Sequence, residues 1–316
     1  MTAVTAAGAA QRPALGVAMI LVMAVCFAGL DTSVRHLGAF FPVLLLLTAR
    51  YGFQALVMAL WLALHRGQRF ASAHPRFQAL RGSLLLATSA MSFYGLQQMP
   101  VPEFTAIIML TPVLVTLLAA WLLAERVSAL RWALVIGGCA GALIVIRPGS
   151  GLFGWAVLYP LAGACTYALF QVLTSRLAAL ENPLTTHFWT GLVGTAILLP
   201  LLLASPLDVT GTLAGASPGQ WGMLLLIGVL GTGGHLMLIL ALGLAPSATL
   251  MPFTYAQIGA AALLGWLVFQ QLPDSWGWLG MLVITVCGAA SAWLNVRSAA
   301  AARRPLSVVT ADSAVD

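Results

Sequence analysis

Residues 94–147 read YGLQQMPVPEFTAIIMLTPVLVTLLAAWLLAERVSALRWALVIGGCAGALIVIR. One apolar segment ends at the turn that contains Pro100 and Pro102, a second ends in the charged loop AERVSALR, and a third follows at once. Apolar segments joined by such short turns predict helical hairpins that cross a bilayer repeatedly, because a soluble domain would need more polar surface between them.

A weaker copy of this unit begins at Ile239 and reads ILALGLAPSATLMPFTYAQIGAAALLGWLVFQQLPDSWGWLGMLVITVCG. At an offset of 145 residues, Trp121 corresponds to Trp266 and Leu122 to Leu267. Self-similarity at a fixed offset indicates an internal repeat. The chain is therefore predicted to consist of two related halves, each built around one such unit.

The composition of the whole chain agrees with a membrane protein. Hydrophobic residues make up 61% of the 316 residues and charged residues only 7%, and the mean hydropathy is +0.99. No stretch alternates polar and apolar residues as a transmembrane β-barrel strand would. The net charge of +6 comes from fourteen Arg residues that lie between apolar segments, as topology determinants do, so we predict no nucleic-acid partner.

We expect no cofactor, disulfide framework or metal site. The four cysteines lie inside apolar segments without CxxC spacing, and they are interpreted as small packing residues; they are Cys26, Cys139, Cys165 and Cys287. The sequence also contains no Walker A, HExxH or GxSxG motif. These absences argue against an ATPase and against the commoner hydrolases.

Ten segments are long enough to span a bilayer at roughly 20 residues each. They lie near 14–37, 41–64, 79–99, 102–124, 129–147, 152–178, 183–204, 219–243, 246–270 and 275–297. With both termini in the cytoplasm, eleven Arg residues face inward and Arg35 and Arg147 face outward, which satisfies the positive-inside rule. The inward set is Arg12, Arg66, Arg69, Arg76, Arg81, Arg126, Arg131, Arg176, Arg297, Arg303 and Arg304.

Five spans in each half make the second half upside down relative to the first, an arrangement that many secondary transporters use. The predicted domains are a first repeat over 1–148, a second over 149–297, and a disordered cytoplasmic tail over 298–316. The fold class is thus an all-α membrane protein with ten transmembrane helices as two inverted five-helix repeats.

The spacing PVLVTLLAAWLLAE from Pro112 to Glu125, the following RVSALRWALVIGG, and Arg50 after Pro42 resemble the drug/metabolite transporter superfamily, within it the EamA-type ten-helix exporters. The resemblance covers residues 14 to 297, and it is nearest to the bacterial amino-acid exporters of this superfamily. The second half departs from the pattern, since it carries Gln257 where the first has Pro112. The resemblance implies export of small metabolites, amino acids first, across the bacterial inner membrane.

Charged residues inside a bilayer are costly and usually face a cavity, so they are the first candidates for a substrate site. Asp31 precedes Arg35 by one helical turn, and it either binds a substrate ammonium or proton or forms an ion pair with Arg35. Arg50 lies within the second segment, where it either binds a carboxylate or holds helices together.

Further polar candidates lie at the outer turn of the first half and within the second half. Tyr94, Gln97, Gln98 and Glu103 are predicted to line the outer mouth of a cavity, although helix-dipole stabilisation alone would account for Glu103. The second half contributes Tyr167 and Gln171 on one helix face, His235 behind a glycine run, and Tyr255 and Gln257 beyond a kink at Pro252. Interrupted helices of this kind commonly form transporter sites, but an interhelical hydrogen bond would equally explain His235.

These residues predict a secondary transporter that moves a small polar metabolite by alternating access, and the resemblance implies that its substrates are amino acids and that it exports them. A multidrug or other metabolite exporter is the alternative within this class, and an intramembrane enzyme with His235 as its base is a remote one. Coupling to protons would require Asp31, Glu103 or His235, and facilitated transport without coupling stays open. The oligomeric state, monomer or homodimer, also stays open.

Overall fold

A computed structural model describes residues 12–65, 69–123, 129–177, 180–244 and 250–302, and within these ranges every regular element is a helix. The first half contains α1 (Pro13–Leu37), α2 (Val43–Leu64), α3 (Pro75–Leu96), α4 (Val101–Ile108), α5 (Thr111–Leu123) and α6 (Ala129–Ile146). The second half contains the 3-10 turn η1 (Gly154–Val157), α7 (Leu158–Leu177), α8 (Pro183–Ala204), α9 (Val209–Ala214), α10 (Pro218–Leu244), the 3-10 turn η2 (Met251–Tyr255), α12 (Ala256–Phe269) and α13 (Ser275–Ala302).

Each predicted segment contains a helix, but several of them differ in extent from the prediction. In the segment 246–270 the 3-10 turn η2 precedes α12, which begins at Ala256, and residues 246–249 lie outside the described ranges. The helix α3 begins at Pro75 and not at residue 79, the segment 102–124 is divided into α4 and α5, and α13 extends to Ala302. Residues 298–302 are therefore helical although a disordered tail was predicted there. Glu125 and Arg126, which the sequence places at the cytoplasmic end of the fourth segment and which we interpret as structural loop residues, lie outside the described residues.

The division between α4 and α5 follows from Pro112. A proline has no N–H group, so the carbonyl of Ile108 loses its helical donor four residues later. The hydroxyl of Thr111 donates to that carbonyl at 2.6 Å, which satisfies it within the break. The second half has an interruption at the corresponding element, where η2, which contains Pro252, precedes α12.

Six helices in the described ranges are long and apolar enough to cross a membrane: Ala14–Leu37, Val43–Leu64, Gly154–Thr174, Pro183–Ala204, Pro218–Ala241 and Pro252–Phe269. Three shorter apolar helices, Val101–Val115, Trp132–Ile146 and Ser275–Ser291, accompany them. The helix α3 has a similar length but carries polar residues near its N-terminal end. This all-helical architecture is that of a multi-pass membrane protein.

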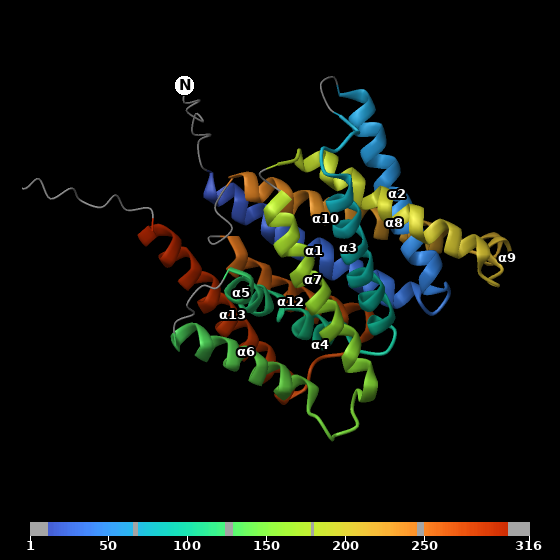
Figure 1. Ribbon diagram of the computed structural model, residues 1–316. Coiled ribbons are helices and arrows are strands. Elements are labelled where there is room, and N and C mark those ends of the chain that lie inside the picture. Colours follow the sequence, from blue (N-terminus) through green and yellow to red (C-terminus); the bar gives the residue numbers. More distant parts are fainter. Residues whose placement is uncertain (1–11, 66–68, 124–128, 178–179, 245–249, 303–316) are drawn as a thin grey trace, which may run out of the picture.

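The helices pack in reciprocal pairs (Figure 1). The pair α6 and α13 lies at one end of the bundle and the pair α2 and α8 at the other, with the crossing pairs α1–α10 and α3–α7 between them.

Close contact between α6 and α13 depends on small residues, as the spacing of Gly137 and Gly141 predicts. A Cβ atom at Gly141 would lie 3.0 Å from the carbonyl oxygen of Gly280, and one at Gly280 would lie 2.7 Å from the carbonyl oxygen of Gly141. Neither position has room for a larger side chain, so the two backbones touch directly.

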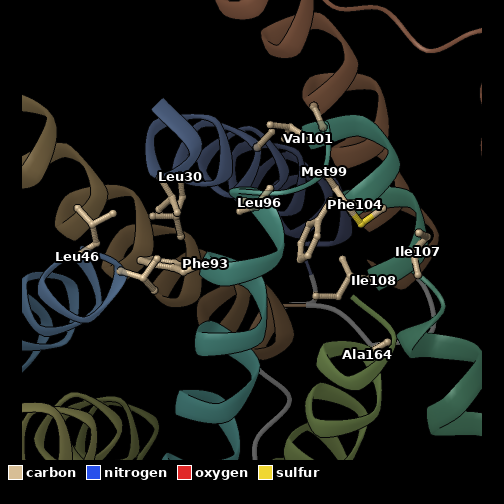
Figure 2. Packing of buried hydrophobic residues seen from close by; sticks show 14 of the residues in the cluster. Leu30, Leu46, Phe93, Leu96, Met99, Val101, Phe104, Ile107, Ile108 and Ala164 are labelled. Atoms are coloured by element: carbon tan, nitrogen blue, oxygen red, sulfur yellow. The ribbon is translucent and has the colours of Figure 1, made fainter. Parts of the chain in front are cut away.

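The hydrophobic core lies where the turn between α3 and α4 packs against α1, α2 and α7. Figure 2 shows its members, including the fully buried Phe93 and Phe104. Because lipid tails are as apolar as these side chains, van der Waals packing holds them together more than exclusion from water does. This packed layer surrounds a group of buried polar residues.

Candidate polar site between the central helices

Arg50 of α2 lies inside the bundle with 2% of its surface exposed. Its Nη1 donates to the hydroxyl of Ser89 on α3 at 2.7 Å, and its guanidinium carbon lies 4.8 Å from the ring centroid of Tyr51. The Nε atom lies beside Gly231 of α10, where it is buried and has no hydrogen-bond partner among the described residues. A buried cation with a free donor is a costly arrangement unless a ligand completes it.

Asp31 of α1 is also buried, and it faces α12 rather than its neighbour along α1. Gln257 donates from Nε2 to the Asp31 carboxylate at 3.4 Å, and the positive charge of Arg50 reaches this carboxylate. Arg35 instead lies over the ring of Phe269, 4.7 Å from its centroid. The predicted alternative of an Asp31–Arg35 ion pair is therefore wrong: the described residues contain no such pair.

His235 lies beside Arg50 and a second buried histidine, His187 of α8. The Nδ1 atom of His235 is 2.9 Å from the carbonyl oxygen of Gly231, and its ring makes an edge contact with Phe27 at 4.8 Å between centroids. The rings of His187 and His235 are stacked with centroids 6.3 Å apart. The predicted interhelical hydrogen bond of His235 is therefore wrong for the described residues, because Gly231 belongs to the same helix, α10. His235 contacts α1 and α8 through its ring alone, at Phe27 and His187.

The predicted cytoplasmic position of Arg81 is wrong. It was counted among the cytoplasmic Arg residues, but it is 3% exposed inside the bundle and stacks on the ring of Phe170. Its guanidinium donates to hydroxyl groups of Thr174 on α7 and Thr190 on α8, and to the carbonyl of Thr186. Arg81 thereby joins α3 to α7 and α8 of the second half.

Tyr167 and Gln171 of α7 form a side-chain pair, as their shared face predicts, and the charges of Arg50 and Arg81 both reach Tyr167. Tyr255 is buried between η2 and α13, where its hydroxyl lies against Gly288 and has no hydrogen-bond partner. Six of the predicted residues thus belong to the central group or its border: Asp31, Arg50, Tyr167, Gln171, His235 and Gln257.

The predicted residues of the outer turn lie apart from that group. Tyr94 and Gln98 are exposed, and Gln97 donates to the backbone carbonyl of Val34, which fastens the end of α3 to α1. Glu103 is buried in the first turn of α4 with its Oε2 unpartnered, and the charge of Arg35 reaches it. Gln97 therefore has a structural role, and Glu103 belongs to a separate charged group near the ends of α1, α4 and α13.

Polar contacts that involve a carboxylate lie at both predicted membrane faces of the protein. At the predicted outer end, Arg147 binds Asp274 through two hydrogen bonds of 2.6 and 3.2 Å. The backbone N–H of Gly277 and this guanidinium hold the pKa of the Asp274 carboxyl below its ordinary value. Each of these contacts favours the ionised carboxylate.

At the predicted inner end, the Glu181 carboxylate accepts hydrogen bonds from the Ser72 hydroxyl and the His74 backbone. Burial would raise the pKa of Glu181, but these hydrogen bonds outweigh it and lower the pKa. Each of the two contacts joins the first half of the chain to the second at one predicted face of the membrane.

A cavity of about 290 Å³ lies elsewhere, between α5 and α7. It is lined by Leu114, Leu117, Leu118, Cys165 and Leu169, all of them apolar or weakly polar. This lining cannot orient a polar solute, so the cavity is not the site that the buried charges indicate.

Three residues of the central group were absent from the predicted site, and each had a sequence signal. Gln54 follows Arg50 by four residues, and Arg81 follows Gln78 by three, so each pair shares a helix face. His187 lies in the polar run TTHFWT of an otherwise apolar segment. Polar periodicity within a span would have found all three.

A bundle of apolar helices that encloses arginine, aspartate, histidine and amide side chains is typical of a multi-pass membrane protein that handles polar solutes. The family model described as "EamA-like transporter family" matches residues 14–147 and 154–292. These ranges cover more than half of the chain, and the chain therefore belongs to the EamA-like transporter family, a result that confirms the resemblance.

Curated relatives are transporters of several different metabolites. The riboflavin transporter of Rhizobium johnstonii is 34% identical over 60% of this chain, a match that spans only 61% of that relative's length. The S-adenosylmethionine uptake transporter of Rickettsia bellii is 23% identical over 85% of this chain and 90% of its own, and the pseudopaline exporter of Pseudomonas aeruginosa is 29% identical over 63% and 69%.

A solved crystal structure, described only as that of a protein, has the same fold. It matches with a TM-score of 0.63 over 90% of this chain and 97% of its own, at 19% identity. At this identity the match concerns the fold alone.

Proposed function

We propose that this chain is a secondary transporter that moves a small polar metabolite across the bacterial inner membrane by alternating access. Ten spans result when α3 is added to the six long spans and the three shorter apolar helices. The reciprocal helix contacts and the two separate family matches support two inverted repeats, at 1–148 and 149–297. Both termini would then be cytoplasmic.

Arg50 is the observation that carries the proposal. Its side chain is anchored to Ser89 of the first half and lies against Gly231 of the second, with Nε buried and unpartnered. A group held between the two halves and lacking a partner is well placed to bind a solute as the halves move.

Amino acids, moved outward, are the substrates that we propose first. The Arg50 guanidinium would bind the α-carboxylate and Asp31 the α-ammonium group, because a zwitterion satisfies one charge of each sign. These two residues lie on α2 and α1, and the charge of Arg50 reaches the Asp31 carboxylate. In this proposal Asp31 is also the residue through which protons would compete with the substrate.

Export of other metabolites or of drugs is the second candidate, and the names of the relatives, which include riboflavin, S-adenosylmethionine and pseudopaline, support the metabolites among these. The variant Asp31→Asn distinguishes the two. A site for zwitterions loses transport with this change, whereas an aromatic pocket for uncharged drugs retains it. An intramembrane enzyme remains a remote alternative, since the relatives named above are transporters.

The proposal is tested with purified protein in liposomes, with radiolabelled amino acids inside or outside and with or without a pH gradient. Saturable flux above that of empty liposomes, suppressed by unlabelled amino acids, is the expected result. A response to the gradient would establish proton coupling. If folded protein moves no amino acid in either direction, the substrate proposal fails, and other metabolites and drugs become the candidates.

A further inference from the structure

The two buried histidines have defined tautomers, which their hydrogen bonds assign. Gln54 places its side-chain nitrogen 3.0 Å from the backbone oxygen of His187 and 3.3 Å from its Nδ1. A carbonyl oxygen only accepts, so the amide nitrogen and not the amide oxygen must face it. That nitrogen only donates, and Nδ1 of His187 is therefore an acceptor. The proton of the neutral ring is on Nε2.

His235 has the opposite tautomer. Its Nδ1 lies 2.9 Å from the carbonyl oxygen of Gly231, which can only accept, so Nδ1 carries the proton. Its Nε2 then presents a lone pair. The stacked ring of His187 presents an N–H group at the corresponding atom.

Neither Nε2 atom has a hydrogen-bond partner within the described residues. His187 is 1% exposed and His235 is 8% exposed, so water does not freely satisfy them in this conformation. The backbone of Thr232 on α10 interacts electrostatically with the His187 ring, but within the described residues no acceptor meets the distance and angle of a hydrogen bond to Nε2. The pair therefore offers one donor and one acceptor from two helices of the second half.

The cations beside the pair are already engaged. The charges of Arg50 and Arg81 reach both histidines. Arg81 donates to threonine oxygens on α7 and α8, and Arg50 is the residue that would hold an α-carboxylate in the proposed function. A second acidic group of a substrate would therefore find no free cation, and it would meet the lone pair of His235 instead.

We propose that His187 and His235 form a subsite for an uncharged group that both accepts and donates hydrogen bonds, of which a side-chain carboxamide is the best match. The carboxamide oxygen accepts from His187 Nε2–H, and its nitrogen donates to His235 Nε2. A carboxylate of the same size only accepts, and it cannot satisfy His235. This inference rests on the proposed function, since it assigns the distal end of an amino-acid substrate.

The test compares matched amides and acids as inhibitors of the flux of a labelled amino acid: glutamine against glutamate, and asparagine against aspartate. In the wild type, each amide should inhibit at a concentration at least about tenfold lower than its acid, because a buried polar atom left unpaired weakens binding strongly. The variant His187→Asn keeps an acceptor for Gln54 but lacks the Nε2 donor, so the ratio should fall toward one. The matched variant His187→Gln keeps a donor near the Nε2 position and should retain the preference.

Two results would overturn the inference while the transporter proposal survives. One is inhibition by the acids that equals or exceeds inhibition by the amides. The other is a His187→Asn variant with lower stability and slower flux but an unchanged ratio, which would give the pair a structural role only. If no amino acid is transported, the shift in melting temperature caused by the same four compounds still reports binding. Absence of any shift would then refute both proposals.

Discussion

Substitution of Gly231 by alanine tests the position of Arg50 without changing any polar group. The new Cβ would lie 2.7 Å from Arg50 Nε, and ordinary contacts begin near 3.4 Å, so the side chain must retreat by about 0.7 Å. A retreat of that size shifts the guanidinium and can lengthen its 2.7 Å bond to Ser89 to about 3.4 Å. If the misaligned guanidinium loses one hydrogen bond to the substrate, which is worth about 1.5–3 kcal/mol for a charged group, the substrate affinity should fall roughly 10- to 150-fold.

The assay is concentration-dependent flux in liposomes, for whichever labelled amino acid the wild type transports. Gly233→Ala is the control, because a Cβ at this position of the same helix meets nothing within 4 Å. We expect a raised KM for Gly231→Ala and a KM close to wild type for Gly233→Ala. Equal KM values for Gly231→Ala and the wild type would refute the role of Arg50 in binding.

Three further substitutions probe the frame around the site. Thr190→Val removes a partner of the buried Arg81 and should lower the free energy of unfolding by about 1–3 kcal/mol, measured by thermal or denaturant unfolding. Gly194→Ala should destabilise by about 1–3 kcal/mol, because its Cβ would overlap the buried tyrosine ring of α2. The lowered pKa of Asp274 means that its bond to Arg147 contributes at neutral pH and is lost as the pH falls through that pKa. Wild type should therefore lose up to about 1 kcal/mol more than Asp274→Asn in melting experiments between about pH 5 and pH 3.

Each of these has a control or a contrary outcome. Thr195→Val removes only a local bond to the Gly191 carbonyl and should change stability less than Thr190→Val does. Gly52→Ala meets no atom within 4 Å and should leave the melting temperature near that of wild type. Identical acid melting profiles for the wild type and Asp274→Asn would show that the outer bond contributes nothing to stability.

The helices could be predicted well from the sequence, because apolar runs of bilayer length with short polar turns leave few alternatives. The internal structure of the predicted segment 102–124 could not be predicted in this way. Pro112 indicates a break, but the way in which Thr111 satisfies the freed carbonyl depends on local geometry. Helix length alone also placed the start of α3 too late, since its first turns carry polar residues that hydropathy excludes.

The candidate site was only partly predictable. The type of a residue indicates how much free energy its burial costs, but it does not indicate which way its side chain faces around the helix. Asp31 and Arg50 were found since a charge within a span is expensive anywhere. Arg81 was assigned to the surface because it lies close to a predicted span end, whereas the packing of α3 against α7 and α8 buries it. Tyr94 was predicted to line the outer mouth of a cavity, and its exposure leaves that prediction open. Helix rotation decides such cases, and the sequence contains no direct signal for it.

The most direct test of a transporter whose substrate site is centred on Arg50 is saturable flux measured side by side for wild type and Arg50→Met in liposomes. Methionine fills much of the volume but cannot bind an anionic or polar group. The account predicts saturable flux for wild type and none for a folded, monodisperse Arg50→Met protein. Saturable flux with an unchanged KM in Arg50→Met would contradict it.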